Sequence, residues 1–222
     1  YKYLDIKLPE AVKPQFGRKH ERHWMEVDEE KDTHPVVSPD GKLEAYIEGE
    51  NVVLHEVGKP YTEKRILSTD GTLSNYYSAW IQWSADSKYI VTCKRRPVEK
   101  RYVYYVESSP ADQLQPILHK QEYAKPGDEL PFKVPCIFDV NTGKEVIAST
   151  QLFDKQFSLD GFTWTADNKE VIFEYNERGH KVYRVLAMSA QTGKVRTIIE
   201  ETATTFVNYP RHFRYDFADT SK

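Results

Sequence analysis

The residues with the clearest potential for chemistry stand in a few short clusters. His20 and His23 have an H-x-x-H spacing, and adjacent carboxylates occur at 29–30 and 200–201. Such imidazoles could bind a metal ion, and paired carboxylates could act as acid and base. However, the histidines lie in a densely charged segment, and the pair at 200–201 ends a predicted strand, where neighbouring side chains point to opposite faces. We interpret both features as solvent-exposed, and the sequence predicts no metal site and no cofactor.

No motif for a nucleophile or for nucleotide binding is present. The chain lacks G-x-S-x-G, H-E-x-x-H and any two glycines spaced as in G-x-G. Its 31 basic and 34 acidic residues nearly balance, which argues against nucleic acid as a partner. No apolar run is long enough to span a membrane. We therefore expect a chain without catalytic residues of its own.

The two cysteines, Cys93 and Cys136, are far apart in the sequence. No C-x-x-C spacing exists, so a zinc knuckle is not expected. The two could form a disulfide, but free cysteine is among the residues most often found buried. Two buried thiols are the interpretation that we favour.

A repeat indicates the elements that position these residues. Aromatic residues make up 13% of the chain, with 15 tyrosines, as suits pleated strands. Three segments share the order aromatic or aliphatic, hydroxyl, small residue or Pro, Asp, then Gly, Ser or Asn, then Lys; they start at positions 37, 83 and 164. The Asp caps its own turn, and the next residue tolerates a left-handed conformation. Each segment therefore predicts a hairpin between two strands.

Further strands complete each repeat. We expect them at 51–57, 101–107 and 181–189, after the three hairpins. Thr-Gly-Lys turns at 142–144 and 192–194 then lead to outer strands at 145–148 and 195–199. Four strands in 40–50 residues are typical of a β-propeller blade.

The fold class is thus all-β, a partial β-propeller with about three full four-stranded antiparallel blades plus partial blades. We expect residues 1–222 to form one propeller fragment, cut from a longer protein. Within it, residues 1–33 form a partial blade or a linker, 34–222 form blades, and 108–135 form a long excursion. Residues 206–217 would open a further blade. Trp80, Trp83 and Trp164 would fill space between blades rather than bind a ligand.

The order of these motifs resembles the N-terminal propeller of dipeptidyl peptidase IV, of the prolyl oligopeptidase clan. The resemblance spans roughly 36–217. Tyr123, Lys125, Gly127 and Gly143 match a Tyr-Pro-Lys-x-Gly segment and a later strand-and-turn motif of the family, after the Tyr-Ser…Trp-Ser segment at 77–84. The resemblance implies a parent serine peptidase whose catalytic Ser, Asp and His lie in a downstream α/β-hydrolase domain.

The resemblance also implies that the propeller gates access and helps to bind the substrate's amino terminus through a Glu-Glu pair. That pair is absent here, where residues 69–76 read Thr-Asp-Gly-Thr-Leu-Ser-Asn-Tyr. Arg178 and His180, in a predicted turn beside a blade, are the candidate substrate-binding residues. A periplasmic or extracellular location follows from the resemblance alone.

Two further expectations concern partners. A partial propeller exposes strand edges and a blade face, so we expect the chain to self-associate. The alternative to a peptidase propeller is a protein- or peptide-binding interaction module without peptidase activity, since fold does not fix function. In that case the long excursion would make the contact.

Overall fold

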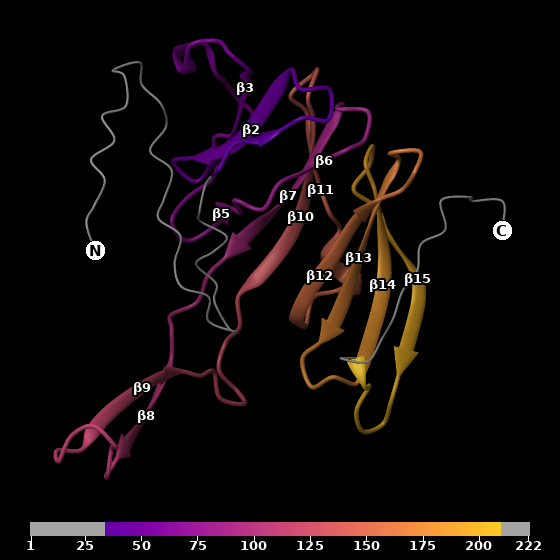
Figure 1. Cartoon of the computed structure of the whole chain (residues 1–222). Coiled ribbons are helices and arrows are strands. Elements are labelled where there is room, and N and C mark those ends of the chain that lie inside the picture. Colours follow the sequence, from indigo (N-terminus) through magenta and orange to yellow (C-terminus); the bar gives the residue numbers. More distant parts are fainter. Residues whose placement is uncertain (1–33, 210–222) are drawn as a thin grey trace.

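The computed structural model describes residues 34–209, and these are built almost entirely from antiparallel strands (Figure 1). The described strands form two four-stranded sheets, one five-stranded sheet and one two-stranded ribbon. Helical turns in this range are short: η2 (Tyr61–Glu63) and η3 (Thr150–Leu152). The all-β prediction is therefore confirmed, with three sheets that correspond to three blades.

Each blade is a meander of antiparallel strands. The first contains β1 (Val36–Val37), β2 (Leu43–Glu48), β3 (Asn51–Glu56) and β4 (Arg65–Ile66). The second contains β5 (Tyr76–Tyr77), β6 (Gln82–Trp83), β7 (Tyr89–Arg96), β10 (Phe132–Asp139) and β11 (Glu145–Ile147), with β5 and β6 both pairing with β7. The third contains β12 (Gln156–Trp164), β13 (Glu170–Glu177), β14 (Val182–Ser189) and β15 (Val195–Thr202). The strands expected at 51–57, 145–148, 181–189 and 195–199 are present as β3, β11, β14 and β15.

The Asp-containing hairpins form as predicted, with the same hydrogen bonds in each blade. In the first, the Ser38 hydroxyl donates to Asp40 Oδ1 at 2.6 Å, and the same oxygen accepts the Lys42 N–H at 3.2 Å. These donors lower the pKa of Asp40 below its ordinary value. The left-handed position is held by Gly41, Ser87 and Asn168, with φ of 73°, 59° and 56°. Hydrogen bonds between near neighbours in the sequence close this turn, which is why the sequence reveals it.

Tryptophan side chains join neighbouring blades. The Trp83 indole N–H donates to the carbonyl of Val36 in the first blade at 2.8 Å, and the Trp164 N–H reaches Gln82 in the second at 3.5 Å. Trp83 is buried and Trp164 is half-buried, as predicted. Trp80 also bridges two blades, through the Phe162 ring at 4.8 Å, but it is 36% exposed and so is not a core residue.

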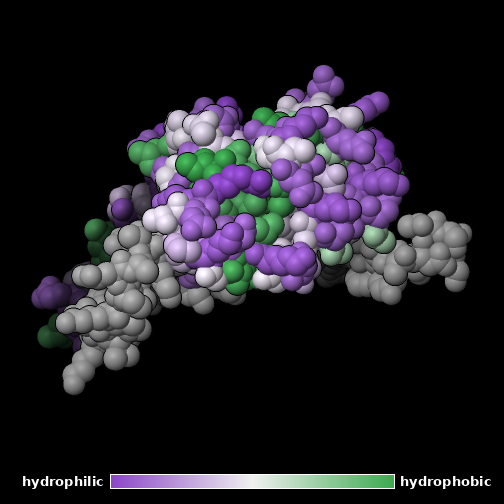
Figure 2. Space-filling model, turned by 90° about the horizontal axis from the view of Figure 1, so that it is seen from above, coloured by the Kyte–Doolittle hydropathy of each residue, from purple (hydrophilic) through white to green (hydrophobic). Residues whose placement is uncertain are grey.

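Two apolar layers lie between the three blades. Side chains alternate along a strand, so the middle blade supplies both layers. Ile90 of β7 packs toward the first blade, and the adjacent Val91 packs toward the third. On β10, Cys136 likewise packs toward the first blade and Ile137 toward the third. On the face seen in Figure 2, apolar surface gathers in the middle of the described part and hydrophilic surface surrounds it.

The strand expected at 101–107 forms but belongs to another sheet. It is β8 (Tyr102–Glu107), and it pairs with β9 (Ile117–Glu122) in a ribbon that projects from the blades (Figure 1). The third strand of the second blade is β10, which pairs with β7 along its whole length. A strand between two blades must bury both faces, and the run Pro135–Phe138 does so, whereas β8 is mostly exposed. Placing 101–107 in the blade was therefore wrong.

Some expectations fall wholly or partly outside the described residues. Residues 1–33, with His20, His23 and the 29–30 carboxylates, lie outside them, and so do 210–217. Residues 206–209 contain no strand; Val207 is instead buried against Tyr183 and Val185 of the third blade. That residues 1–222 form one propeller fragment stays a prediction.

Within 34–209, no helix is long and apolar enough to cross a membrane.

Candidate functional site

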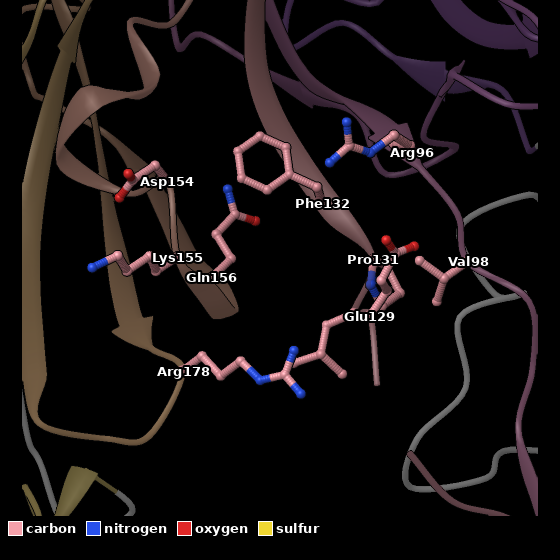
Figure 3. Close-up of a pocket in the computed structure, with 10 residues that line it drawn as sticks. Arg96, Val98, Glu129, Pro131, Phe132, Asp154, Lys155, Gln156 and Arg178 are labelled. Atoms are coloured by element: carbon pink, nitrogen blue, oxygen red, sulfur yellow. The ribbon is translucent and has the colours of Figure 1, made fainter. Parts of the chain in front are cut away.

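A cavity of about 610 Å³ lies between the second and third blades, where strands of both end or begin. Arg96 ends β7, Phe132 begins β10, Gln156 begins β12 and Arg178 follows β13 (Figure 3). The remaining lining comes from Val98, Glu129, Leu130, Pro131, Asp154 and Lys155. Cavities of this volume accommodate small molecules or a few peptide residues.

Gln156 fixes the two blades to each other beside this cavity. Its side-chain Oε1 accepts the Lys133 N–H at 3.0 Å, and its Nε2–H donates to the Lys133 carbonyl at 2.7 Å. Strand β11, which pairs with the outer edge of β10, does not reach Lys133. The last backbone hydrogen bond on that edge of β10 is made at Pro135, whose carbonyl accepts the Ala148 N–H. Because backbone groups alternate in direction along a strand, Lys133 faces the same side as Pro135. The Gln156 amide thus takes the place of the missing strand.

The cavity carries two arginines that no carboxylate of the described residues neutralises. The Arg96 Cζ lies 5.5 Å from the centroid of the Phe132 ring. The backbone N–H of Arg178 donates to the Lys155 carbonyl at 2.8 Å. Neither guanidinium forms an ion pair or a side-chain hydrogen bond with any residue among 34–209. In Figure 3 both extend toward the open centre of the cavity. Sequence reasoning missed Arg96; the only signal was its position before Pro97, which ends the strand.

The two predicted site residues lie in different surroundings. Arg178 is exposed and lines the cavity. His180 lies in the same turn but is not among the lining residues. Its ring contacts the aromatic side chains of Phe157, Phe206 and Tyr209. The turn residue Gly179 separates them, with a φ of 92° that a side chain would strain.

His180 attaches the segment after β15 to the third blade. Its ring stacks on Tyr209 with centroids 4.8 Å apart, and its Nδ1 lies 3.1 Å from Asn176 Oδ1. Its carbonyl accepts the Val207 N–H at 2.7 Å. Burial lowers the pKa of His180 below its ordinary value, because the charged ring would lose hydration. This environment suits a structural histidine.

Acid is expected to loosen this attachment. The unfolded histidine titrates near pH 6.5 and the folded one lower, so below about pH 6.5 the unfolded state binds more protons and the free energy of unfolding falls. The free energy of unfolding should be highest above about pH 6.5. It should decline as the pH falls from there toward the pKa of folded His180. Hydrogen exchange of the Val207 amide at pH 7.5 and 5.5, corrected for intrinsic rates, measures this.

The variant His180→Asn is the matched control for this measurement. Asparagine tolerates the positive φ of 55° at this position and does not titrate in this range. Its corrected exchange should change less with pH than that of the wild type. Equal pH dependence in both proteins would contradict the assignment to His180.

The cysteines form no reactive site. Both are free and buried, which confirms the favoured interpretation. Cys136 pairs with Thr92 across the two strands, and so shares a face with it, whereas Cys93 is the next residue along β7 and points to the other face. Burial raises the pKa of the Cys136 thiol well above its ordinary value. A thiol that stays protonated is a poor nucleophile.

Comparison with known protein families identifies the fold. The model of the dipeptidyl peptidase IV (DPP IV) N-terminal region matches residues 10–221. The chain belongs to this family. The match covers all three blades and the projecting ribbon, so the resemblance seen in the motifs is confirmed. No curated protein matches the chain in a sequence search.

Solved structures of two bacterial proteins share the DPP IV-type fold. Dipeptidyl peptidase 4 from Porphyromonas gingivalis superposes with a TM-score of 0.57 at 14% identity, over 81% of this chain and 27% of the other. A putative dipeptidyl aminopeptidase IV from Bacteroides ovatus ATCC 8483 gives a TM-score of 0.56 at 13% identity, over 79% and 25%. The chain thus spans about a quarter of the length of either protein.

The segment where the DPP IV resemblance implies a Glu-Glu pair is a tight turn in this member of the family. Thr72 and Asn75 form an isolated bridge within 69–76. Asp70, the only acid there, accepts a hydrogen bond from the Tyr77 hydroxyl at 2.8 Å and pairs with Lys94. Lys94 above all lowers the pKa of Asp70. A carboxylate committed to these partners does not replace an acidic pair.

The acidic pair at 200–201 is structural. Glu200 and Glu201 lie on the exposed outer strand β15, and Glu200 bonds Arg184 of β14. They pair with successive residues of β14, so they point to opposite faces of the sheet. The interpretation of this pair as a solvent-exposed strand feature agrees with this position.

Proposed function

We propose that this chain is the propeller portion of a dipeptidyl peptidase IV-like serine peptidase. In this proposal the propeller gates access to a hydrolase domain outside these 222 residues and helps to position the peptide substrate. The match to the DPP IV N-terminal region over 10–221 is the observation that carries it. The cavity beside Arg178 supports it, since it offers polar groups and apolar walls at a blade interface.

The proposal includes a periplasmic or extracellular location for the protein. Its support is the family membership and the likeness to two bacterial peptidases. Fractionation of cells that express the full-length protein tests it, with a cytoplasmic enzyme as marker. Recovery with that marker would contradict the location.

Fluorophosphonate labelling of the full-length protein tests the peptidase function. We expect labelling of one serine, together with turnover of chromogenic dipeptide-Pro substrates or longer peptides. The length preference would show how the substrate amino terminus is held without the Glu-Glu pair. A folded full-length protein that neither labels nor hydrolyses any of these peptides would exclude the proposal.

The β8–β9 ribbon favours a second candidate function, protein binding. Tyr104, Val106 and Leu118 share one face of the ribbon and are 61%, 60% and 67% exposed. A two-stranded ribbon alone is marginally stable in water, so it benefits from a partner. Self-association of the chain, through this ribbon or through open strand edges, belongs to this proposal.

Light scattering with size-exclusion chromatography tests self-association. We expect the mass of the wild type to rise with concentration, and the double variant Tyr104→Ser/Val106→Ser to stay closer to one chain. A wild type that remains monomeric at high concentration would exclude self-association. Full activity of a monomeric parent would further favour the peptidase over the interaction module.

A further inference from the structure

The cavity owes one wall to an insertion that the other two blades lack. The corresponding strands are joined by tight turns in the first blade, between β2 and β3, and in the third, between β13 and β14. In the second blade the chain leaves at Arg96 and returns at Phe132. The ends of this insertion contribute Val98, Glu129, Leu130 and Pro131 to the lining. The insertion therefore gives this cavity a wall that the tight turns of the first and third blades do not supply.

Arg96 and Arg178 extend their guanidinium groups into this cavity (Figure 3). Arg96 is held against the Phe132 ring, and the backbone of Arg178 is held by the Lys155 carbonyl. The lining contains three basic and two acidic side chains, with Lys155 as the third cation and Glu129 and Asp154 as the acids. Neither acid forms an ion pair with either arginine. The arginines thus keep their hydrogen-bonding capacity for a ligand.

We infer that this cavity binds a carboxylate of a peptide through Arg96 and Arg178. Guanidinium groups bind carboxylates with two parallel, charge-assisted hydrogen bonds, and a nearby aromatic ring keeps the group oriented. Phe132, Leu130 and Pro131 supply apolar surface for the chain that carries the carboxylate. That the peptide is a substrate rests on the proposed function; that a carboxylate binds does not.

The carboxylate has two possible sources in a peptide, the carboxyl terminus or the side chain of an aspartate or glutamate. Three fluorescent pentapeptides separate them. The first has a free carboxyl terminus, the second is its amide, and the third is that amide with one central glutamate. Binding to the full-length protein, treated with fluorophosphonate to prevent turnover, is followed by fluorescence anisotropy.

We expect one or both carboxylate peptides to bind about 10- to 100-fold more tightly than the neutral amide, the usual effect of hydrogen bonds to a charged group. Arg178→Gln and Arg96→Gln should each remove most of this preference and leave the binding of the amide unchanged. Arg101→Gln is the control, because Arg101 is also exposed but lies outside the cavity and pairs with Glu99. It should keep the preference.

The outcomes separate this inference from the proposed function. Equal binding of all three peptides, or an unchanged preference in both arginine variants with native thermal unfolding, would overturn the carboxylate site. A carboxylate preference that depends on the arginines, in a protein that does not label with fluorophosphonate, would support the site and exclude the peptidase. Labelling and turnover without the preference would exclude the site alone.

Discussion

Replacing Trp83 with alanine is expected to lower the free energy of unfolding by about 3–5 kcal/mol. The side chain is only 7% exposed and lies in the apolar layer between the first and second blades. Its removal leaves a large cavity. The Val36 carbonyl also loses the hydrogen bond that it accepts from the indole N–H. Urea unfolding followed by far-ultraviolet circular dichroism measures the change without relying on tryptophan fluorescence.

Two further variants separate packing from hydrogen bonding at this interface. Trp83→Phe keeps an aromatic ring but loses the hydrogen bond, so it should cost about 1–3 kcal/mol. Trp80→Ala removes a tryptophan that is 36% exposed, with one ring contact to Phe162, and should cost about 1 kcal/mol. Similar losses for Trp80→Ala and Trp83→Ala would show that the interface does not depend on the buried indole.

Replacing Gln156 with leucine is expected to cost about 2–4 kcal/mol, since two hydrogen bonds are lost and both Lys133 backbone groups lose their partner. The position is 6% exposed, so water cannot readily replace the amide. Gln156→Glu keeps the acceptor for the Lys133 N–H but turns a carboxylate oxygen toward the Lys133 carbonyl. Gln156→Glu should therefore also destabilise the protein, although the glutamate side chain has nearly the same shape as glutamine.

Hydrogen exchange and chemical unfolding together test the role of Gln156. The Lys133 amide should exchange faster in Gln156→Leu, whereas the amides of β14 should change only through the global loss of stability. Gln151→Glu is the control, because Gln151 is exposed, and it should change stability by less than about 0.5 kcal/mol. A Gln156→Leu variant as stable as the wild type would show that the amide does not join the blades.

The sequence was sufficient for features that depend on neighbouring residues. The Asp-containing hairpins and the Thr-Gly-Lys turns close through bonds between residues a few positions apart, and each needs a residue that accepts positive φ, such as Gly143 or Asn168. Their spacing gave the number of complete blades. Burial of Trp83 and of both cysteines followed from residue type and from position in the repeat.

The tertiary structure alone decided which distant strands pair and which side chains meet. The segments at 101–107 and 132–139 both read as strands, but only packing between blades selects β10, because a strand there must bury both faces. Arg178 and His180 are two positions apart, yet the turn directs one toward the cavity and the other into an aromatic cluster. Arg96 of the second blade and Gln156 of the third meet Arg178 at this cavity. Contacts of this kind depend on the three-dimensional packing of the blades, for which a local sequence pattern carries no signal.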